Sequence, residues 1–259
     1  NTPENSPASC APATTFRLST LDLRPVFDTH CHLTFKEFAG QTARILADAA
    51  AVGVRGAITI ATTSDDCLRA VELAKAHDNL WCSAGVHPLY SDQPINWDDV
   101  RTAAQHPKRI AWGELGLDNH YEDPPAAVQR RVLEEGLAFI ADFESRRTPP
   151  PPDSPPHKPI IVHCRESFDD LLAVFRSLPS TFDPSRFVFH CFTGTPADAR
   201  KVLDFGAWIS FTGIVTFPNA RDVAEAAKLV PADRIMVETD SPFLTPEPVR
   251  KVRPNEPKY

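Results

Sequence analysis

The sequence has no run of 18 apolar residues, which excludes a membrane-spanning helix and argues against a membrane partner. Residues 1–24 are polar and lack the apolar stretch of a secretory signal, so we expect an N-terminal polar extension there. Lys and Arg number 27 against 34 Asp and Glu, a formal net charge of −7. A broad basic surface is therefore not expected, and any contact with nucleic acid should be local.

Disulfides are also not expected, because six cysteines in 259 residues are too few for a disulfide framework. Three of them directly follow histidines: Cys31, Cys164 and Cys191. We expect all six to be reduced thiols. This pattern is typical of an intracellular protein, and it predicts a cytoplasmic location, or a nuclear one in a eukaryote.

Eight short apolar segments are spread along the chain, several of them rich in Val, Ile, Phe and Trp, as buried strands are. Stretches of helical character, such as 41–54 and 126–146, lie between them. This alternation predicts an α/β fold, a (β/α)8 TIM barrel over residues 25–259. An open doubly wound sheet is the alternative, but no glycine-rich phosphate loop follows the first strand. The predicted strands are Val26–His32, Gly56–Thr62, Trp81–His87, Ile110–Leu117, Ile160–Arg165, Phe187–Phe192, Ala207–Thr212 and Ile235–Asp240.

Two segments depart from this regular pattern. Residues 148–159 hold seven prolines and cannot form a helix. We interpret them as a stiff insertion at the bottom of the barrel, with a PxxP docking site as the alternative. After the eighth predicted strand only 19 residues remain, without an apolar period. The last helix of the barrel is therefore expected to be missing, either because the chain is cut short or because its natural tail is absent.

The stretch "FDTHCHL" contains two histidines separated by one residue, His30 and His32, at the end of the first strand. Side chains alternate along a strand, so the two imidazoles should point to the same face. Cys31 should then point to the helices, and the same reasoning applies to Cys164 and Cys191. We interpret these cysteines as packing residues rather than ligands.

Four further ligand-type residues end separate apolar strands. His163 ends "PIIVHCR", His190 ends "RFVFHC", Asp240 ends "RIMVETD", and Glu114 lies in "AWGELGLD". In a barrel all these strand ends face one pocket. Any one buried histidine is more often a core residue, but coincidence at five strand ends points to a site. Four histidines and two carboxylates exceed one zinc site and suit two divalent ions that share a bridging carboxylate and hydroxide.

Residues near these ligands have candidate roles of their own. Asp28 and Glu238 each precede a ligand by two residues, and could accept the second N–H of a ligating histidine. Arg165 should face the pocket and could bind a phosphate through two hydrogen bonds, or else form a salt bridge on the rim. His87, which ends the third strand, is interpreted as a substrate contact, a proton shuttle or merely a loop-start residue.

The motifs "DTHCHL", "AGVHPL", "GELGLD", "IVHCRES", "FHCFTG", "ISFTGIVTF" and "VETDSPFL" together resemble the TatD-related metal-dependent hydrolases, a branch of the amidohydrolase-like barrels. The resemblance runs from about Val26 to about Pro257. It implies a deoxyribonuclease that removes nucleotides from DNA ends. It also implies site roles: one metal on His30 and His32, the other on His163 and His190, Glu114 as the bridge, and Asp240 as a ligand that orients or deprotonates the attacking water.

The chain departs from the family pattern in its proline-rich insertion and in its missing C-terminal segment. Glu114 also stands where other two-metal amidohydrolases use a carboxylated lysine, which argues against phosphotriesterase-like and dihydroorotase-like activities. Imidazole favours zinc as the bound ion, while the carboxylates would accept magnesium or manganese during activity.

The leading hypothesis is a metal-dependent deoxyribonuclease, exonucleolytic, whose hydroxide is activated by two metals. Its substrate would be a DNA end or another nucleotide-containing molecule, and few basic contacts would give a weak dependence on salt. A second hypothesis is hydrolysis of a small ester, amide or aminoacyl-RNA bond in the same pocket. A third is a metal-binding scaffold without activity. The sequence leaves the oligomeric state open.

Overall fold

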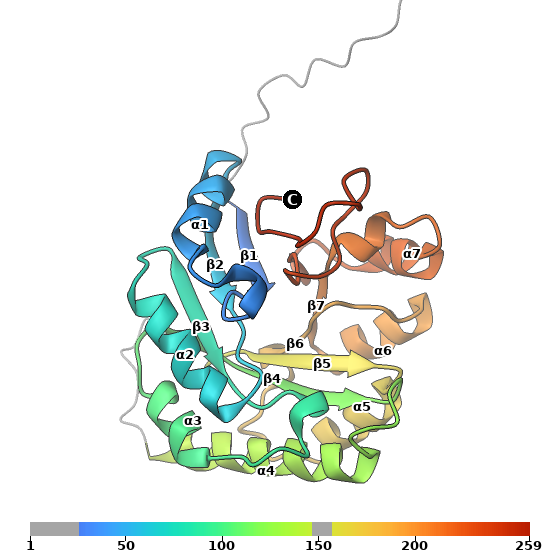
Figure 1. The fold of residues 1–259 in the computed structure, drawn as a ribbon. Coiled ribbons are helices and arrows are strands. Elements are labelled where there is room, and N and C mark those ends of the chain that lie inside the picture. The colour runs from blue at the N-terminus through green and yellow to red at the C-terminus, as the bar shows by residue number, and fades with distance from the viewer. Residues whose placement is uncertain (1–25, 147–156) are drawn as a thin grey trace, which may run out of the picture.

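The computed structural model describes residues 26–146 and 157–259. The expected N-terminal extension and most of the proline-rich insertion lie outside these residues. Eight parallel strands stand side by side in chain order, as in a barrel, which confirms the predicted fold (Figure 1). The strands are β1 (Val26–Cys31), β2 (Val54–Thr59), β3 (Leu80–Ala84), β4 (Arg109–Asp118), β5 (Ile160–Arg165), β6 (Phe187–Phe189), β7 (Trp208–Phe211) and β8 (Ile235–Val237).

One α-helix follows each strand from β1 to β7 and returns the chain to the start of the next, which keeps all strands parallel. The helices are α1 (Thr42–Ala51), α2 (Ser64–Lys75), α3 (Trp97–Ala104), α4 (Ala126–Ser145), α5 (Phe168–Arg176), α6 (Pro196–Phe205) and α7 (Arg221–Leu229). No helix follows β8 within residues 238–259, as expected. Among the residues described, none of the helices is long and apolar enough to cross a membrane.

Short 3-10 helices lie between some of these elements: η1 (Lys36–Phe38), η2 (Pro88–Tyr90), η3 (Pro184–Arg186) and η4 (Gly213–Thr216). Three of them, η1, η2 and η4, follow the C-terminal ends of β1, β3 and β7 closely. They therefore belong to the loops at the top of the barrel, the face where barrel enzymes place their active sites.

The barrel closes through residues that lie just beyond β8. The backbone N–H of Asp240 donates to the carbonyl oxygen of His30 over 2.8 Å, and the N–H of His32 donates to the carbonyl oxygen of Ser241 over 2.7 Å. Cys31 and Ser241 form a parallel bridge. The seam between the first and last strands is thus made by residues at the predicted site.

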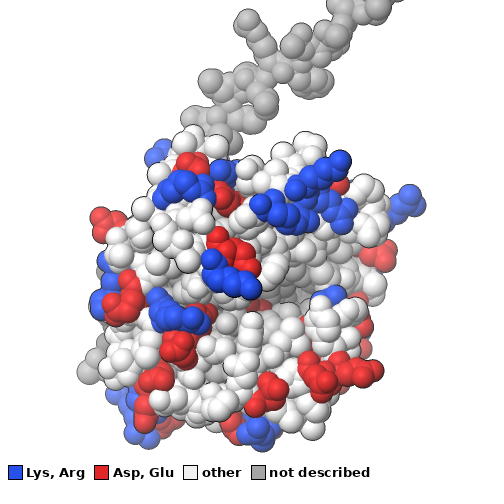
Figure 2. Space-filling model, viewed as in Figure 1, with Lys and Arg blue, Asp and Glu red and all other residues white. Residues whose placement is uncertain are grey.

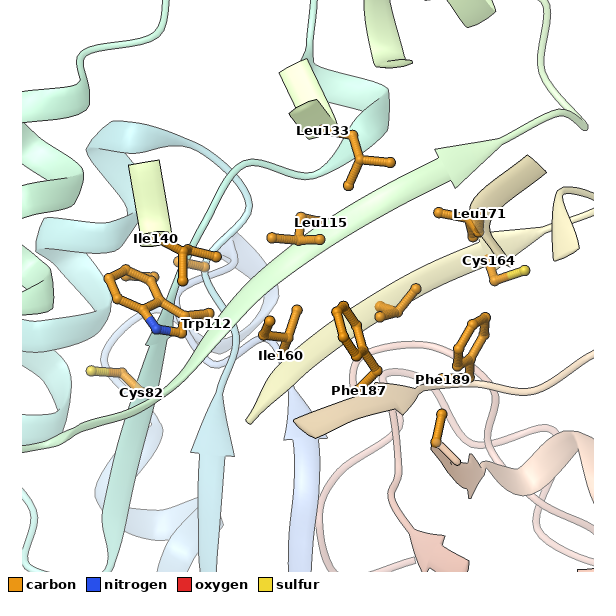
Figure 3. Packing of buried hydrophobic residues seen from close by; sticks show 14 of the residues in the cluster. Cys82, Trp112, Leu115, Leu133, Ile140, Ile160, Cys164, Leu171, Phe187 and Phe189 are labelled. Atoms are coloured by element: carbon orange, nitrogen blue, oxygen red, sulfur yellow. The ribbon is translucent and has the colours of Figure 1, made fainter. Parts of the chain in front are cut away.

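The main apolar core lies between the strands and the helices (Figure 3). It includes Ile160 and Val162 of β5, whereas Ile161 packs in a separate small cluster with Ile60 and Ala111. Because side chains alternate along a strand, Ile161 must point into the barrel. His163, two residues further, shares that face and lies above the small cluster.

Cysteines occupy two different environments. The five that the structure describes are free thiols, while Cys10 lies outside the described residues. Cys31 and Cys164 are buried in the main core, on the helix side, as expected. Cys191 is only partly buried, is absent from that core and lines the pocket at the top of the barrel, which Cys164 also borders. The predicted packing of Cys191 against the helices is therefore wrong. The reason is that β6 ends at Phe189, and Cys191 has a φ of 43°, which a strand cannot have.

Ion pairs and hydrogen bonds hold the C-terminal segment against the barrel. The Arg44 guanidinium of α1 lies 2.7 Å from Glu256, and Lys258 lies 3.0 Å from Asp48. Asn255 is fully buried, and its side-chain amide donates to two carbonyl oxygens of the loop that follows β8. These contacts fix the loop that carries Asp240.

Candidate metal centre

The predicted ligands meet at the C-terminal ends of the strands, around a pocket of about 820 Å³. His30 is fully buried behind the pocket wall. The other five reach the wall: His32, Glu114, His163, His190 and Asp240. The register of the strands fixes how far along the barrel axis each of these ligands lies. Gly116 of β4 pairs with His163 of β5, and a Cβ at Gly116 would collide with the carbonyl oxygen of His163.

One oxygen of Glu114, Oε2, faces the histidine pair of β1. It lies 3.3 Å from His30 Nε2 and 3.9 Å from His32 Nε2. Oδ1 of Asp240 lies on the same pair, 3.6 Å from His30 Nε2 and 3.4 Å from His32 Nε2. The two Nε2 atoms are themselves only 3.2 Å apart. Two imidazole nitrogens and two carboxylate oxygens therefore converge on one point.

The other oxygen of Glu114, Oε1, faces a second group of histidines. It lies 2.6 Å from His190 Nε2, 2.8 Å from His163 Nδ1 and 3.2 Å from His87 Nε2. Glu114 thus stands between two histidine clusters, with one oxygen turned to each. This is the arrangement that a carboxylate needs in order to bridge two ions.

Protein oxygens lie within hydrogen-bond distance of the distal nitrogen of two of these imidazoles, and a third imidazole has a carboxylate nearby without a hydrogen bond. Nδ1 of His32 lies 3.1 Å from the carbonyl oxygen of Ile60, and Nε2 of His163 lies 2.9 Å from Oδ2 of Asp118. Nδ1 of His190 lies 3.5 Å from Oε1 of Glu238. When His32 and His163 are neutral with the proton on this outer nitrogen, the other ring nitrogen can offer its lone pair on the side of Glu114.

The donor set fits divalent cations. Oε2 of Glu114 is buried without a hydrogen-bond partner among the described residues. The Nε2 atoms of His30 and His32 face each other and two carboxylate oxygens. A single proton between the two nitrogens would leave the carboxylate oxygens without a donor, whereas a cation would attract all four atoms. Imidazole nitrogen and carboxylate oxygen are ordinary zinc ligands, and the carboxylates suit manganese or magnesium. Three groups of residues have ligand atoms close enough to one another to hold an ion: His30–His32–Glu114, His30–His190–Glu238 and His87–Glu114–His163.

The charges of the site are strongly coupled. Burial would raise the pKa of Glu114, but the neighbouring His190, His87 and His30 lower it well below its usual range. Burial likewise opposes the ionised form of Asp240, yet His32 and His30 lower the pKa of that carboxyl. Both carboxylates are therefore anions at neutral pH, as metal ligands must be.

His87 is engaged at both ring nitrogens. Its Nδ1 accepts the backbone N–H of Leu89 over 3.0 Å. Burial lowers the pKa of His87 to about 4, so the ring is neutral at pH 7 and carries its single proton on Nε2. That N–H lies 3.1 Å from Nδ1 of His163, its hydrogen-bond partner, and 3.2 Å from Oε1 of Glu114. The geometry favours a hydrogen-bond donor over a metal ligand at this position.

The two carboxylates that were predicted to accept an N–H of a ligating histidine, Glu238 and Asp28, make different contacts from each other. Glu238 lies 3.5 Å from Nδ1 of His190 without a recorded hydrogen bond to it, and accepts the Cys191 backbone N–H over 2.6 Å. Asp28 makes no hydrogen bond to an imidazole. Its oxygens accept instead the backbone N–H and the hydroxyl of Thr239, over 3.0 and 2.6 Å. Burial raises the pKa of Asp28 to about 7. Asp28 thus joins β1 to the end of β8.

Arg165 lies at the pocket wall, as predicted, and not in a salt bridge that the structure records. Its guanidinium lies 5.1 Å above the ring of Tyr121 and donates to the Tyr121 hydroxyl over 3.4 Å. This contact orients the guanidinium while leaving its planar donor fork at the edge of the pocket.

Sequence reasoning missed Asp118, which is almost fully buried and holds His163. The signal was present in the motif "GELGLD", because Asp118 follows Glu114 by four residues in one strand. Even spacing places both carboxylates on the same face.

Three comparisons with known proteins show which family the chain resembles. A family model described as TatD related DNase matches residues 27–145 and 154–259. The chain is 38% identical over 226 residues to the uncharacterized metal-dependent hydrolase YcfH of Escherichia coli K12, which covers 86% of this chain and 80% of YcfH. It is 30% identical over 244 residues to a protein of Salmonella typhimurium named 3'-5' ssDNA/RNA exonuclease TatD, covering 90% and 86%.

The fold has a solved counterpart as well. The crystal structure of YJJV, a TatD homolog from Escherichia coli K12, matches with a TM-score of 0.78 at 27% sequence identity. The match covers 90% of this chain and 85% of YJJV. The likeness therefore extends over most of both chains.

Proposed function

The chain belongs to the TatD related DNase family of metal-dependent hydrolases, and we propose that it removes nucleotides from the ends of nucleic-acid strands by hydrolysing phosphodiester bonds. Some relatives carry the name 3'-5' ssDNA/RNA exonuclease, while others are named only as metal-dependent hydrolases. The proposal extends the exonuclease activity in that first name to this chain.

The observation that carries the proposal is the position of Glu114. Its Oε2 faces His30 and His32, and its Oε1 faces His163 and His190. A buried carboxylate shared in this way supports a centre of two divalent ions. Such ions, when bound, act as Lewis acids on a phosphoryl oxygen and make water a nucleophile near neutral pH.

Each ligand has a defined place in this proposal. His30, His32 and Asp240 would hold one ion together with Oε2 of Glu114. His163 and His190 would hold the other with Oε1. Asp118 holds the distal nitrogen of His163 and would act as a positioning residue that keeps this ring aimed at the site. Glu238, 3.5 Å from Nδ1 of His190, would do the same for that ring.

Asp240 is the candidate proton acceptor. Its carboxylate is anionic at neutral pH, reaches the pocket, and lies beside the ligands of one ion. A water molecule between Asp240 and the scissile phosphorus would lose a proton to this carboxylate as its oxygen attacks. The P–O bond to the leaving sugar oxygen would break in the same displacement, and that oxygen would take up a proton from protonated Asp240 or from solvent, which restores the carboxylate. Arg165 would donate two hydrogen bonds to the non-bridging phosphate oxygens, a geometry that guanidinium supplies and ammonium does not. His87 would hold Glu114 in place through its Nε2–H.

Surface charge supports recognition of a strand end rather than of a long duplex. The overall charge is negative, but Figure 2 shows Lys and Arg gathered over the C-terminal loops at the edge of the hollow. These loops carry Arg250, Lys251 and Arg253. A few basic residues at the mouth of a pocket suffice for a strand end, and we expect a weak dependence of binding on salt.

The test is release of nucleotides from end-labelled single-stranded DNA and RNA, after chelation and addition of magnesium, manganese or zinc. We expect metal-dependent release by the wild type, and a loss of at least a hundredfold in Asp240→Asn, because the proton acceptor and a ligand are removed together. Asp233→Asn, an exposed residue before β8, is the matched control. A folded, metal-loaded wild type that releases no nucleotide would contradict the proposal and favour a carbonyl substrate.

A further inference from the structure

A half-exposed phenylalanine stands beside the metal centre. Phe243 is 49% exposed, lines the pocket, and follows Asp240 by three residues. Exposed aromatic rings are common singly on protein surfaces. This one is distinct because its backbone is rigidly held and its ring adjoins the proposed ligands.

The backbone around Phe243 is fixed on both sides. Its N–H donates to the carbonyl oxygen of Asp240 over 2.9 Å, and its carbonyl oxygen accepts from the Asn255 side-chain amide over 2.6 Å. Asp240 and Leu244 have φ values of 54° and 58°, in the left-handed region that disfavours such residues. Strained residues of this kind persist where the surroundings hold them, often at functional sites.

The ring of Phe243 extends an aromatic wall from the ligand His32. Phe35 stacks on His32 with ring centroids 4.7 Å apart, and Phe243 meets Phe35 edge to face at 6.1 Å. Phe243 also lies edge to face with His32, at 6.4 Å. An apolar wall cannot bind the phosphate itself. It must face a planar or apolar part of the substrate, one that lies within a nucleotide's length of the metal centre.

A second part of the pocket wall, formed by Tyr121 and Arg165, combines an aromatic ring with a positive charge. Tyr121, the other half-exposed aromatic residue of the pocket, has the Arg165 guanidinium over its ring. That wall presents charge to a phosphate. The two walls therefore divide the pocket into a cationic side at Arg165 and an aromatic side at Phe243, which matches the two chemical parts of a nucleotide.

We propose that Phe243, supported by Phe35, is a stacking site for an unpaired nucleobase at the strand end being cleaved. The proposal rests on the proposed nuclease function and adds the residue that recognises the base. Stacking is tolerant of base identity, because every base offers a π face. A base inside a duplex is covered by its neighbours, so this site favours single-stranded ends.

The test compares two single-stranded oligonucleotides that are identical except that the terminal nucleotide of one is abasic, prepared for each end in turn. Base–aromatic stacking corresponds to roughly tenfold or more in kcat/KM. We expect metal-loaded wild type to prefer the intact end by about that factor. Phe243→Ala should lose this preference by slowing only the intact substrate, and Phe243→Trp should retain it. Melting temperatures should agree within a few degrees, because the ring is half exposed.

Two outcomes would overturn the proposal: Phe243→Ala slows the intact and abasic ends equally, or it slows neither. A measurement of binding distinguishes failure of the stacking proposal from failure of the nuclease function. Fluorescence anisotropy with metal-loaded Asp240→Asn, compared with the same protein carrying Phe243→Ala, measures base-dependent affinity without turnover. If the wild type proves inert but binding is base-dependent through Phe243, the stacking site stands and the hydrolysis claim fails. Equal binding of both oligonucleotides by both proteins would remove the stacking site.

Discussion

The backbone N–H of Asp240 donates to the carbonyl oxygen of His30 over 2.8 Å, and the side chains of the same two residues face each other 3.6 Å apart in the metal centre. The seam that closes the barrel and one half of the proposed metal site are therefore made by the same residues. Ions bound there would connect the first strand with the end of the last, so metal binding and barrel stability should be linked.

Removal of metal should lower the melting temperature. An ion present at 100 to 1,000 times its Kd adds about 3–4 kcal/mol to the free energy of unfolding. In a chain of this size that corresponds to a shift of roughly 5 to 15 °C. Calorimetry of chelated and zinc-reloaded protein measures it. Identical melting temperatures in both states, with reloading verified by elemental analysis, would argue against a metal across the seam.

Asp118→Asn should weaken metal binding without abolishing it. The substitution removes the charge that accepts the Nε2–H of His163, and loss of such a partner costs roughly 10- to 100-fold in affinity. The control is Glu122→Gln, an exposed carboxylate in the loop after β4. Competition with a chromogenic chelator gives the affinities. If Asp118→Asn and Glu122→Gln bind zinc equally well, Asp118 has no role in holding His163.

Arg165→Lys should raise KM for an oligonucleotide by roughly tenfold, because an ammonium cannot make the paired hydrogen bonds of a guanidinium to phosphate. The contact with the Tyr121 ring would also weaken. Arg176→Lys, on the exposed end of α5, serves as the control. Steady-state kinetics at two salt concentrations would report the change. An unaltered KM in Arg165→Lys would exclude the proposed phosphate contact.

The C-terminal contacts should make stability depend on acid pH. The hydrogen bond from Arg44 lowers the pKa of Glu256 from 4.5, and that from Lys258 lowers the pKa of Asp48 from 3.8. A carboxyl whose folded pKa is depressed stabilises the fold above its unfolded pKa. That contribution is lost as the pH falls through the folded value. The difference in urea midpoint between wild type and Glu256→Gln should therefore be present at pH 7.

The same difference should begin to shrink as the pH falls below the ordinary pKa of a glutamate, and should be lost as the pH falls through the lowered pKa of folded Glu256. Glu37→Gln, which alters an exposed carboxylate of η1, should leave the midpoint nearly unchanged at either pH. A difference between wild type and Glu256→Gln that stays constant from pH 7 to pH 3.5 would show that the Arg44–Glu256 pair does not act through charge.

The strands were predictable where the apolar pattern alone determines them. β5 runs over Ile160–Arg165, the predicted range. β6 and β8 end three residues earlier than predicted, because the chain leaves the sheet to turn a ligand into the pocket. Cys191 and Asp240 have positive φ values there, and no periodicity of side chains reveals such a turn. The prediction for Cys191 failed for this reason.

The arrangement of the site was less predictable than its residue types. Strand ends bring the ligand-type residues together in any barrel, so His163 and Glu114 could be expected near each other. The partner of Asp28 could not be foreseen, since its contact with Thr239 depends on how the first and last strands meet. The role of Asp118 was missed, but it could have been predicted from its even spacing to Glu114 in the motif.

The most direct test of the account is a zinc titration of chelated wild type and Glu114→Gln by calorimetry, with the exposed Glu134→Gln as control. If Glu114 bridges two ions, the wild type and the control should each bind two ions per chain. Glu114→Gln should then lose affinity at both sites by at least tenfold, because one oxygen serves each site. Binding of two ions by Glu114→Gln with unchanged affinity, or of a single ion by the wild type, would contradict the bridged centre.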